Sequence, residues 1–253
     1  MDSGIALSTR ALTVLVVDDF LVNRLLLNRQ LSYLGHCVIE AEDGEQGLEQ
    51  WRAHEFDVVI SDCNMPGLSG YELASAIRDE ERAYGLPPTR ILGFTANAQP
   101  EEKIRCLEAG MDDCLFKPIL LADLRGWLGA RFAADLPAPI EDHSATGIDL
   151  TGLERYVGED RTLINRLLRE LAQSNHDDRI HLLQAHVGDN RPRLQELAHR
   201  IKGSARIVRA ERLIECCEDL ERACAEGRAA LIDEAVDQLQ RAMKSLGQHL
   251  TRD

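Results

Sequence analysis

The stretch LTVLVVDD, Leu12 to Asp19, decides the fold of the first half of the chain. A short, nearly all-apolar run that ends in two aspartates is typical of a strand buried on both faces and ending at a polar edge. The amphipathic segment FLVNRLLLNRQLSYL follows it directly. The same alternation continues through the apolar runs CVI, FDVVIS, RILGF and DCLF as far as about Phe132. This order predicts an α/β domain with a five-stranded, parallel, doubly wound sheet and helices on both faces.

Length and charge limit the possible functions. The 253 residues are enough for two modest domains, and the formal net charge of -14 argues against binding to nucleic acid or to an anionic membrane. Protein partners and metal ions are favoured instead. The run ALTVLVV near the start is far shorter than the roughly 20 residues that cross a bilayer, and no signal peptide precedes it. The seven cysteines form no C-x-x-C pair, which predicts reduced, mostly buried thiols in a cytoplasmic protein.

Composition changes at the segment AADLPAPIEDHSATG, which is rich in proline and small residues and reads as a linker. Beyond it the apolar residues recur with a helical period, and the segment lengths predict a four-helix bundle. The first of these helices is either continuous or broken near Asn175. The predicted units are an N-terminal tail (1–10), an α/β domain (11–132), a linker (133–147) and an all-α domain (148–253).

Polar residues stand at the ends of four predicted strands: Asp18 and Asp19, then Asp62, Thr95 and Lys117. In a parallel sheet these positions gather at the carboxyl edge. Three carboxylates crowded together repel one another unless a hard divalent cation lies among them, and Mg²⁺ fits best. Such a site suits phosphoryl transfer, with Asp62 as the nucleophile, Mg²⁺ and Lys117 stabilising phosphoryl oxygens, and Thr95 donating a hydrogen bond.

The pieces VLVVDD, DCNMPGLSG, GFTANA and CLFKP resemble the response-regulator receiver domain over nearly all of residues 10–132. The resemblance implies that Asp62 is the phosphoacceptor and that Thr95 and Lys117 sense and hold the phosphate. It also implies a cis peptide between Lys117 and Pro118. The implied magnesium ligands are Asp18, Asp19, Asp62 and the backbone carbonyl of Asn64.

One position departs from the receiver pattern. Receivers that switch an output domain usually carry an aromatic residue three positions before the lysine, and this chain has Cys114 there. The departure puts an output mechanism based on aromatic rotation in doubt. It suits a receiver that passes its phosphoryl group onward.

A second candidate site lies in the segment AHRIKGSARIV of the all-α domain. His199 is off the apolar stripe of its helix and is expected to face solvent, with Lys202 and Gly203 one turn along on the same face. Lys202 would neutralise an incoming phosphoryl group, and Gln195 would orient the imidazole or a phosphate oxygen. Gly203 costs the helix about 1 kcal/mol relative to alanine. We interpret the missing side chain as leaving room for the rim of a receiver pocket to approach.

The helix around His199 is locally basic, with Arg206 among seven basic residues against two acidic ones between positions 191 and 212. Such a face would dock on an acidic receiver rim, although an ordinary solvated helix face explains some of the arginines. The pattern H-x-x-K-G resembles the signature of histidine phosphotransfer (Hpt) domains over about residues 148–250.

The order receiver, linker, Hpt resembles the C-terminal part of tripartite hybrid sensor histidine kinases. No glycine-rich loop of an ATP-binding kinase domain is found in the sequence, so we expect a phosphotransfer protein that does not phosphorylate itself from ATP. In this reading Asp62 takes a phosphoryl group from a histidine kinase, His199 receives it, and a separate response regulator takes it from His199. The alternatives are a phosphate sink with reverse flow and a DNA-binding response regulator. The expected location is cytoplasmic, at the inner face of the membrane if the chain is part of a sensor kinase.

Overall fold

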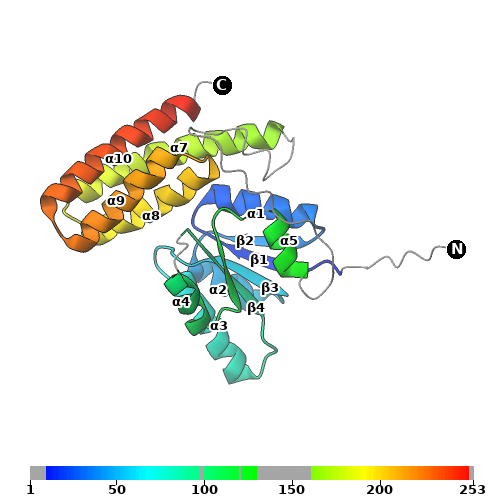
Figure 1. Ribbon diagram of the computed structural model, residues 1–253. Coiled ribbons are helices and arrows are strands. Elements are labelled where there is room, and N and C mark those ends of the chain that lie inside the picture. The colour runs from blue at the N-terminus through cyan, green and yellow to red at the C-terminus, as the bar shows by residue number, and fades with distance from the viewer. Residues whose placement is uncertain (1–9, 97–99, 120, 130–160, 251–253) are drawn as a thin grey trace.

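The computed structural model describes residues 10–96, 100–119, 121–129 and 161–250 (Figure 1). The predicted linker, 133–147, and all but the last residue of the predicted tail, 1–10, lie outside the described residues. Within the described ranges no helix is both long enough and apolar enough to cross a membrane.

The first domain is built on a five-stranded sheet with the strand order β2-β1-β3-β4-β5. All neighbouring strands are parallel, which confirms the α/β prediction. Strand β1 forms because its five residues are almost all β-branched or aliphatic, and four of them are completely buried. The strands are β1 (Thr13–Val17), β2 (Cys37–Ala41), β3 (Val58–Asp62), β4 (Arg90–Thr95) and β5 (Asp113–Phe116).

Helices cover both faces of this sheet, as predicted (Figure 1). Alternate strand residues point to opposite faces, so Val14 and Val16 pack with α1 and α5, whereas Leu15 and Val17 pack with α2, α3 and α4. The helices are α1 (Leu21–Tyr33), α2 (Gly44–Ala53), α3 (Gly70–Tyr84), α4 (Pro100–Glu108) and α5 (Leu121–Gly129).

Within residues 161–250 four helices form the second domain, which confirms the predicted bundle. The first helix is continuous through Asn175, whose side-chain amide donates to the carbonyl of Met243 on the fourth helix at 2.9 Å. Asn190 caps the second helix by accepting from the N–H of Arg193 at 3.1 Å. The helices are α7 (Arg161–Val187), α8 (Arg191–Ile207), α9 (Glu211–Glu226) and α10 (Ala229–Leu250).

The two domains pack against each other through α1 and α7 (Figure 1). Phe20, Val22 and Leu26 of the receiver-like domain belong to the same apolar cluster as the bundle core, with Leu163 and Ile164 at its margin. Apolar side chains shared across the junction stabilise one relative orientation by removing their surface from water. In this orientation α8 faces the carboxyl edge of the sheet.

Candidate functional site

Three carboxylates meet at the carboxyl edge of the sheet, as the sequence predicted. Asp18 follows β1, Asp19 is next to it, and Asp62 is the last residue of β3. One oxygen from each side chain lies within 4.8 Å of the others. Asp18 and Asp62 are buried and Asp19 is partly exposed, so the cluster has one accessible side. This donor set fits Mg²⁺, which prefers carboxylate oxygens and keeps several water ligands.

Lys117 supplies the positive charge of the cluster. Its Nζ atom lies 2.8 Å from Oδ2 of Asp18 and 2.6 Å from Oδ2 of Asp62. Burial by itself lowers the pKa of Lys117, but the two aspartates outweigh it and raise that pKa above its usual value. The ammonium is therefore a fixed charge, held by its contacts with Asp18 and Asp62. The peptide bond between Lys117 and Pro118 is cis, as the resemblance implied.

Burial also dominates the electrostatics of the carboxylates. It raises the pKa of Asp19 to about 6, with a further increase from the negative charge of Asp18. Burial raises the pKa of Asp62 as well, while Lys117 opposes this effect. Both shifts come first from burial, and repulsion between the aspartates adds to them, so a cation bound among the carboxylates would favour their ionised form.

The remaining predicted receiver residues lie around this cluster. Thr95 is the last residue of β4, next to β5, and is completely buried. The backbone N–H of Asn64 donates to Oδ1 of Asp62 at 3.2 Å, and the Asn64 side chain is exposed. Asp18 is fixed by the side-chain amide of Asn23, which lies 3.0 Å from its Oδ2. The sequence analysis missed Asn23, whose position one turn into α1 carried no distinctive signal.

His199 projects from α8 toward this edge of the sheet. Its Nε2 atom lies 3.3 Å from the side-chain nitrogen of Asn64. An amide nitrogen donates hydrogen bonds, so this contact fits the imidazole tautomer with the proton on Nδ1 and a lone pair on Nε2. Only 21% of the side chain is exposed. His199 is therefore off the apolar stripe, as expected, but only partly open to solvent, because Asn64 of the first domain lies against it.

Glu221 on α9 lies on the other side of the imidazole. Its Oε1 atom is 3.6 Å from Nδ1 of His199, and its Oε2 atom accepts from Nζ of Lys202 at 2.6 Å. Burial raises the pKa of Glu221, but the nearby imidazole of His199 and the hydrogen bond from Lys202 lower it by more, which keeps the carboxylate ionised. The sequence analysis missed Glu221, because α9 carries several glutamates and nothing in their spacing distinguishes this one.

The position of Lys202 corrects a prediction. Its side chain was expected on the open face beside His199, but Lys202 is 5% exposed and its ammonium is held by Glu221. The methylene stem lies in the bundle while the charged end reaches a carboxylate on the next helix. In this structure Lys202 therefore contacts Glu221, and Glu221 in turn lies beside the imidazole.

The steric explanation for Gly203 is also corrected. A Cβ atom at this position would meet no other atom within 4 Å, so no part of the first domain presses against it here. Gln195 is exposed and Arg206 is partly exposed, and both line the same interdomain cleft as His199. Arg206 lies 3.9 Å from Glu218 on α9. Among the hydrogen bonds of the described residues, none links Gln195 to His199.

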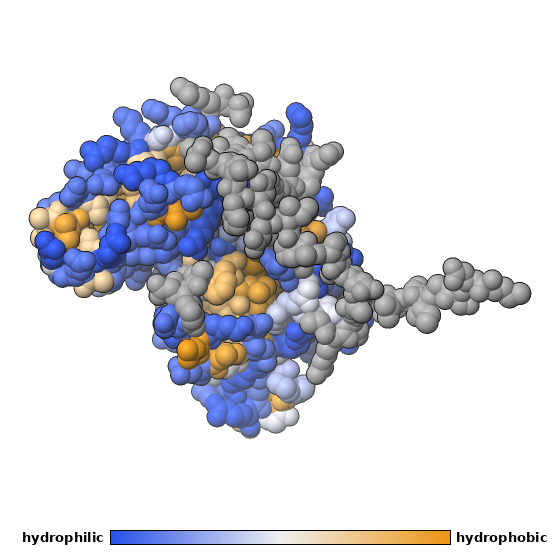
Figure 2. Space-filling model, in the orientation of Figure 1, coloured by the Kyte–Doolittle hydropathy of each residue, from blue (hydrophilic) through white to orange (hydrophobic). Residues whose placement is uncertain are grey.

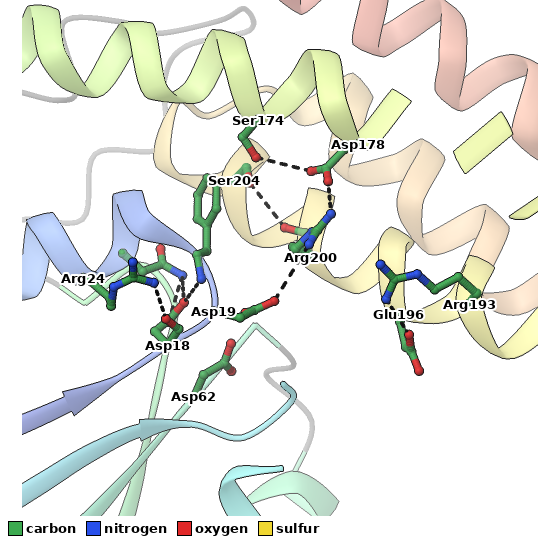
Figure 3. A network of polar contacts seen from close by, with 12 residues as sticks. Asp18, Asp19, Arg24, Asp62, Ser174, Asp178, Arg193, Glu196, Arg200 and Ser204 are labelled. Carbon is green, nitrogen blue, oxygen red and sulfur yellow. Dashed lines mark hydrogen bonds and ion pairs between the residues drawn. The ribbon is translucent and has the colours of Figure 1, made fainter. Parts of the chain in front are cut away.

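Arg200, next to His199, joins the two domains electrostatically. Its guanidinium forms an ion pair with Asp178 of α7 and lies 3.9 Å from Oδ2 of Asp19 (Figure 3). Figure 3 shows the three aspartates gathered beneath this arginine. The sequence analysis counted Arg200 only as one of several basic residues on α8. Its contact with Asp19 depends on how the domains pack, which periodicity does not reveal.

A cleft of about 990 Å³ separates the remaining surfaces of the two domains. In Figure 2 the outline of the molecule is notched between the bundle and the first domain, and the bundle surface in view is largely hydrophilic. The cleft is lined by Asp19 and Asn64 from one side and by His199, Gln195 and Glu221 from the other. It gives solvent and small anions access to the histidine.

Comparisons with known proteins agree with the fold. Residues 14–128 match the response regulator receiver domain and residues 153–249 match the Hpt domain. The chain therefore belongs to the two-component signalling family, as a receiver domain followed by an Hpt domain. This membership contradicts the alternative of a DNA-binding output domain, because the segment in question is the Hpt domain.

The relatives are sensor proteins much longer than this chain. The virulence sensor protein BvgS of Bordetella pertussis is 45% identical over 87% of this chain and 19% of its own length. The sensor protein EvgS of Escherichia coli is 37% identical over 83% of this chain and 17% of its own length. The chain thus spans about a fifth of the length of these relatives. Among solved structures, the chemotaxis protein CheY4 of Vibrio cholerae is 32% identical, covering 47% of this chain and 98% of that one with a TM-score of 0.44.

Proposed function

We propose that this chain is a phosphorelay intermediate in which Asp62 accepts a phosphoryl group and passes it to His199. The observation that carries the proposal is the contact of Asn64 with both residues, through its backbone N–H to Asp62 and through its side chain to His199. Two candidate acceptors that face one interface are what a transfer within the chain requires. The domain families support a histidine kinase as the donor to Asp62 and a response regulator as the acceptor from His199.

The receiver side supplies charge and position for the reaction. Asp18, Asp19, Asp62 and the backbone carbonyl of Asn64 would hold Mg²⁺, which when bound supplies positive charge for the phosphoryl oxygens. Lys117, whose ammonium already donates to Asp62, stabilises a phosphoryl oxygen. Thr95 donates a hydrogen bond from the end of β4. These roles follow from charge and position in a buried cluster, where electrostatic stabilisation is strong.

On the Hpt side, the lone pair of Nε2 forms a bond to phosphorus while the bond from phosphorus to the Asp62 oxygen breaks and the carboxylate is restored. The proton on Nδ1 stays in place, so positive charge develops on the ring. Glu221, 3.6 Å from Nδ1, stabilises that charge, and Lys202 holds Glu221 in position. Lys202 is thus a positioning residue, and Arg206 and Gln195 line the route to the cleft.

Labelling with a small phosphodonor such as acetyl phosphate tests this function. The wild-type chain should be labelled first at Asp62, as an acid-labile and base-labile acyl phosphate, and then at His199. An Asp62→Asn variant should lose both labels, whereas His199→Gln should keep the label on Asp62. Labelling of His199 in the Asp62→Asn variant would contradict the proposed order.

The direction of flow distinguishes the relay from a phosphate sink, the alternative that the sequence left open. A relay should transfer label from the wild-type chain to an added response regulator. A sink should instead shorten the lifetime of phosphate on a regulator that was labelled beforehand, and that result would overturn the forward direction. The cytoplasmic location expected from the sequence, which does not bear on the direction of flow, stays a prediction.

A further inference from the structure

Three cysteine thiols meet in the receiver core beneath the phosphoacceptor. Cys63 directly follows Asp62, Cys106 belongs to α4 and Cys114 belongs to β5. All three are free and buried, and their Sγ atoms lie within 4.8 Å of one another. The Sγ atoms of Cys63 and Cys106 are 3.5 Å apart. Three thiols from distant parts of the chain therefore converge on one point, and the proposed phosphotransfer does not use them.

The backbone leaves room at this point. A Cβ atom at Gly93 of β4 would lie 2.6 Å from Sδ of Met111, 3.0 Å from Sγ of Cys106 and 3.2 Å from Sγ of Cys63. These distances are shorter than ordinary contacts with a side-chain carbon, so any side chain at Gly93 would displace the sulfurs. The thioether of Met111 is thus a fourth sulfur beside the cluster, and the glycine keeps the space between the sulfurs open.

The thiol spacing matches a metal site. The centre of a triangle with sides between 3.5 Å and 4.8 Å is about 2.0 to 2.8 Å from its corners, which brackets a metal–thiolate distance of about 2.3 Å. A cation could therefore bind with little movement of the side chains.

The composition of the cluster selects the ion. Zn²⁺ almost always takes four ligands, and among the described residues only three thiols, with no histidine or carboxylate, form this group. Soft thiolate and thioether sulfurs favour Cu(I), which is stable with two or three sulfur ligands in a dry site. We propose that Cys63, Cys106 and Cys114 form a Cu(I) site in the receiver core, with Met111 as an additional sulfur neighbour.

Binding would change the receiver without any redox step. Each coordinating thiol loses its proton to solvent as the copper–sulfur bond forms, and no electron is transferred. The ligands lie one residue after Asp62, in α4, and three residues before Lys117. Copper would therefore fix α4 to the two strands that carry the phosphoacceptor and its lysine. We expect bound Cu(I) to change the rate at which Asp62 is labelled.

The binding test is an anaerobic titration of the reduced, full chain with Cu(I) supplied as its coloured bicinchoninate complex. The wild-type chain should remove one Cu(I) per molecule from the chelator. Cys106→Ser should weaken this binding at least about tenfold, because it leaves only two thiols at the site. Matched controls are Cys217→Ser, a buried thiol in the bundle, and Cys37→Ser, an exposed thiol in β2, and both should bind as the wild type does.

Failure of the folded wild-type chain to take Cu(I) would overturn the site, as would Cys106→Ser binding as tightly as the wild type. If circular dichroism shows that Cys106→Ser is unfolded, Cys114→Ala replaces it. The wild-type titration decides whether the Cu(I) site exists in either case. One equivalent of Cu(I) should alter Asp62 labelling at least about twofold in the wild type and not in Cys106→Ser. An unchanged rate in copper-loaded wild type would overturn the coupling to phosphorylation. Binding is measured without phosphotransfer, so its outcome is separate from that of the proposed function.

Discussion

Nε2 of His199 lies 3.3 Å from the side-chain nitrogen of Asn64, a residue whose backbone N–H donates to Asp62. The two proposed phosphoacceptors are thus connected through one intervening residue that belongs to the loop after β3. Apolar packing of Phe20 and Leu26 in the bundle core supports the same domain arrangement. This arrangement supports a transfer from Asp62 to His199 in the present docking of the two domains, with the exposed Asn64 side chain between them.

Removal of magnesium should prevent labelling of Asp62, because Lys117 alone does not neutralise three clustered carboxylates. Chelation with EDTA is the first measurement. Asp19→Asn should weaken Mg²⁺ binding by at least about tenfold in a calorimetric titration, since it removes one ligand. Asp79→Asn, a change of an exposed acid on α3, is the matched control. Full labelling in EDTA would contradict a magnesium-dependent acceptor.

Lys202→Met should slow transfer to His199 and leave Asp62 labelling unchanged, because the ammonium holds Glu221 and does not reach the receiver. The measurement is the rate at which label appears on His199 in a chain already labelled at Asp62. Exposed Lys244→Met on α10 is the control for loss of a positive charge. Transfer at the wild-type rate in Lys202→Met would contradict the proposed positioning role of Lys202.

Glu221→Gln should interact energetically with Lys202→Met. Each single change leaves a buried partner without its counter-charge, and the double change removes both. We therefore expect the double variant to be more stable than additivity predicts, by about 0.5 to 3 kcal/mol in urea unfolding. Strict additivity of the two single effects on the free energy of unfolding would show that the ion pair does not contribute to stability.

Gly203→Ala should stabilise the Hpt domain by about 1 kcal/mol, because alanine is the better helix former and its Cβ would meet no atom within 4 Å. Thermal or urea unfolding of the two chains measures this difference. A loss of stability would show that the position is more crowded than the structure indicates. If the variant is stabilised but no longer accepts label from Asp62, the open space beside Gly203 is needed by the phosphoryl group.

The α/β fold was predictable because short, mostly apolar runs alternate with longer segments, and in α2, α3 and α4 these segments have a clear amphipathic period. The acidic cluster followed from the same pattern, since Asp18, Asp62 and Lys117 stand where parallel strands end. Periodicity assigns a residue to a face of its own helix, but it does not say what covers that face. For this reason His199 was expected to face solvent, whereas Asn64 of the receiver domain lies against it and leaves it only partly exposed.

Contacts between side chains on distant elements could not be predicted from the sequence. Glu221 lies on a different helix from His199 and among several similar acids, and only the packing of α8 on α9 selects it. Arg200 approaches Asp19 only because α1 packs on α7. Charge balance correctly indicated a basic helix near an acidic rim, but the individual ion pairs depend on the orientation of the domains.

Transfer within one molecule is the central claim, and concentration dependence tests it most directly. An Asp62→Asn chain, which keeps His199, is mixed with a His199→Gln chain, which keeps Asp62, and the transfer rate is compared with that of the intact chain across a dilution series. Two groups held in one chain have an effective concentration of about millimolar, well above micromolar protein. The intact chain should therefore transfer at a rate independent of dilution and much faster than the mixture. Equal rates, or an intact-chain rate that falls in proportion to its concentration, would show that the domains react between molecules.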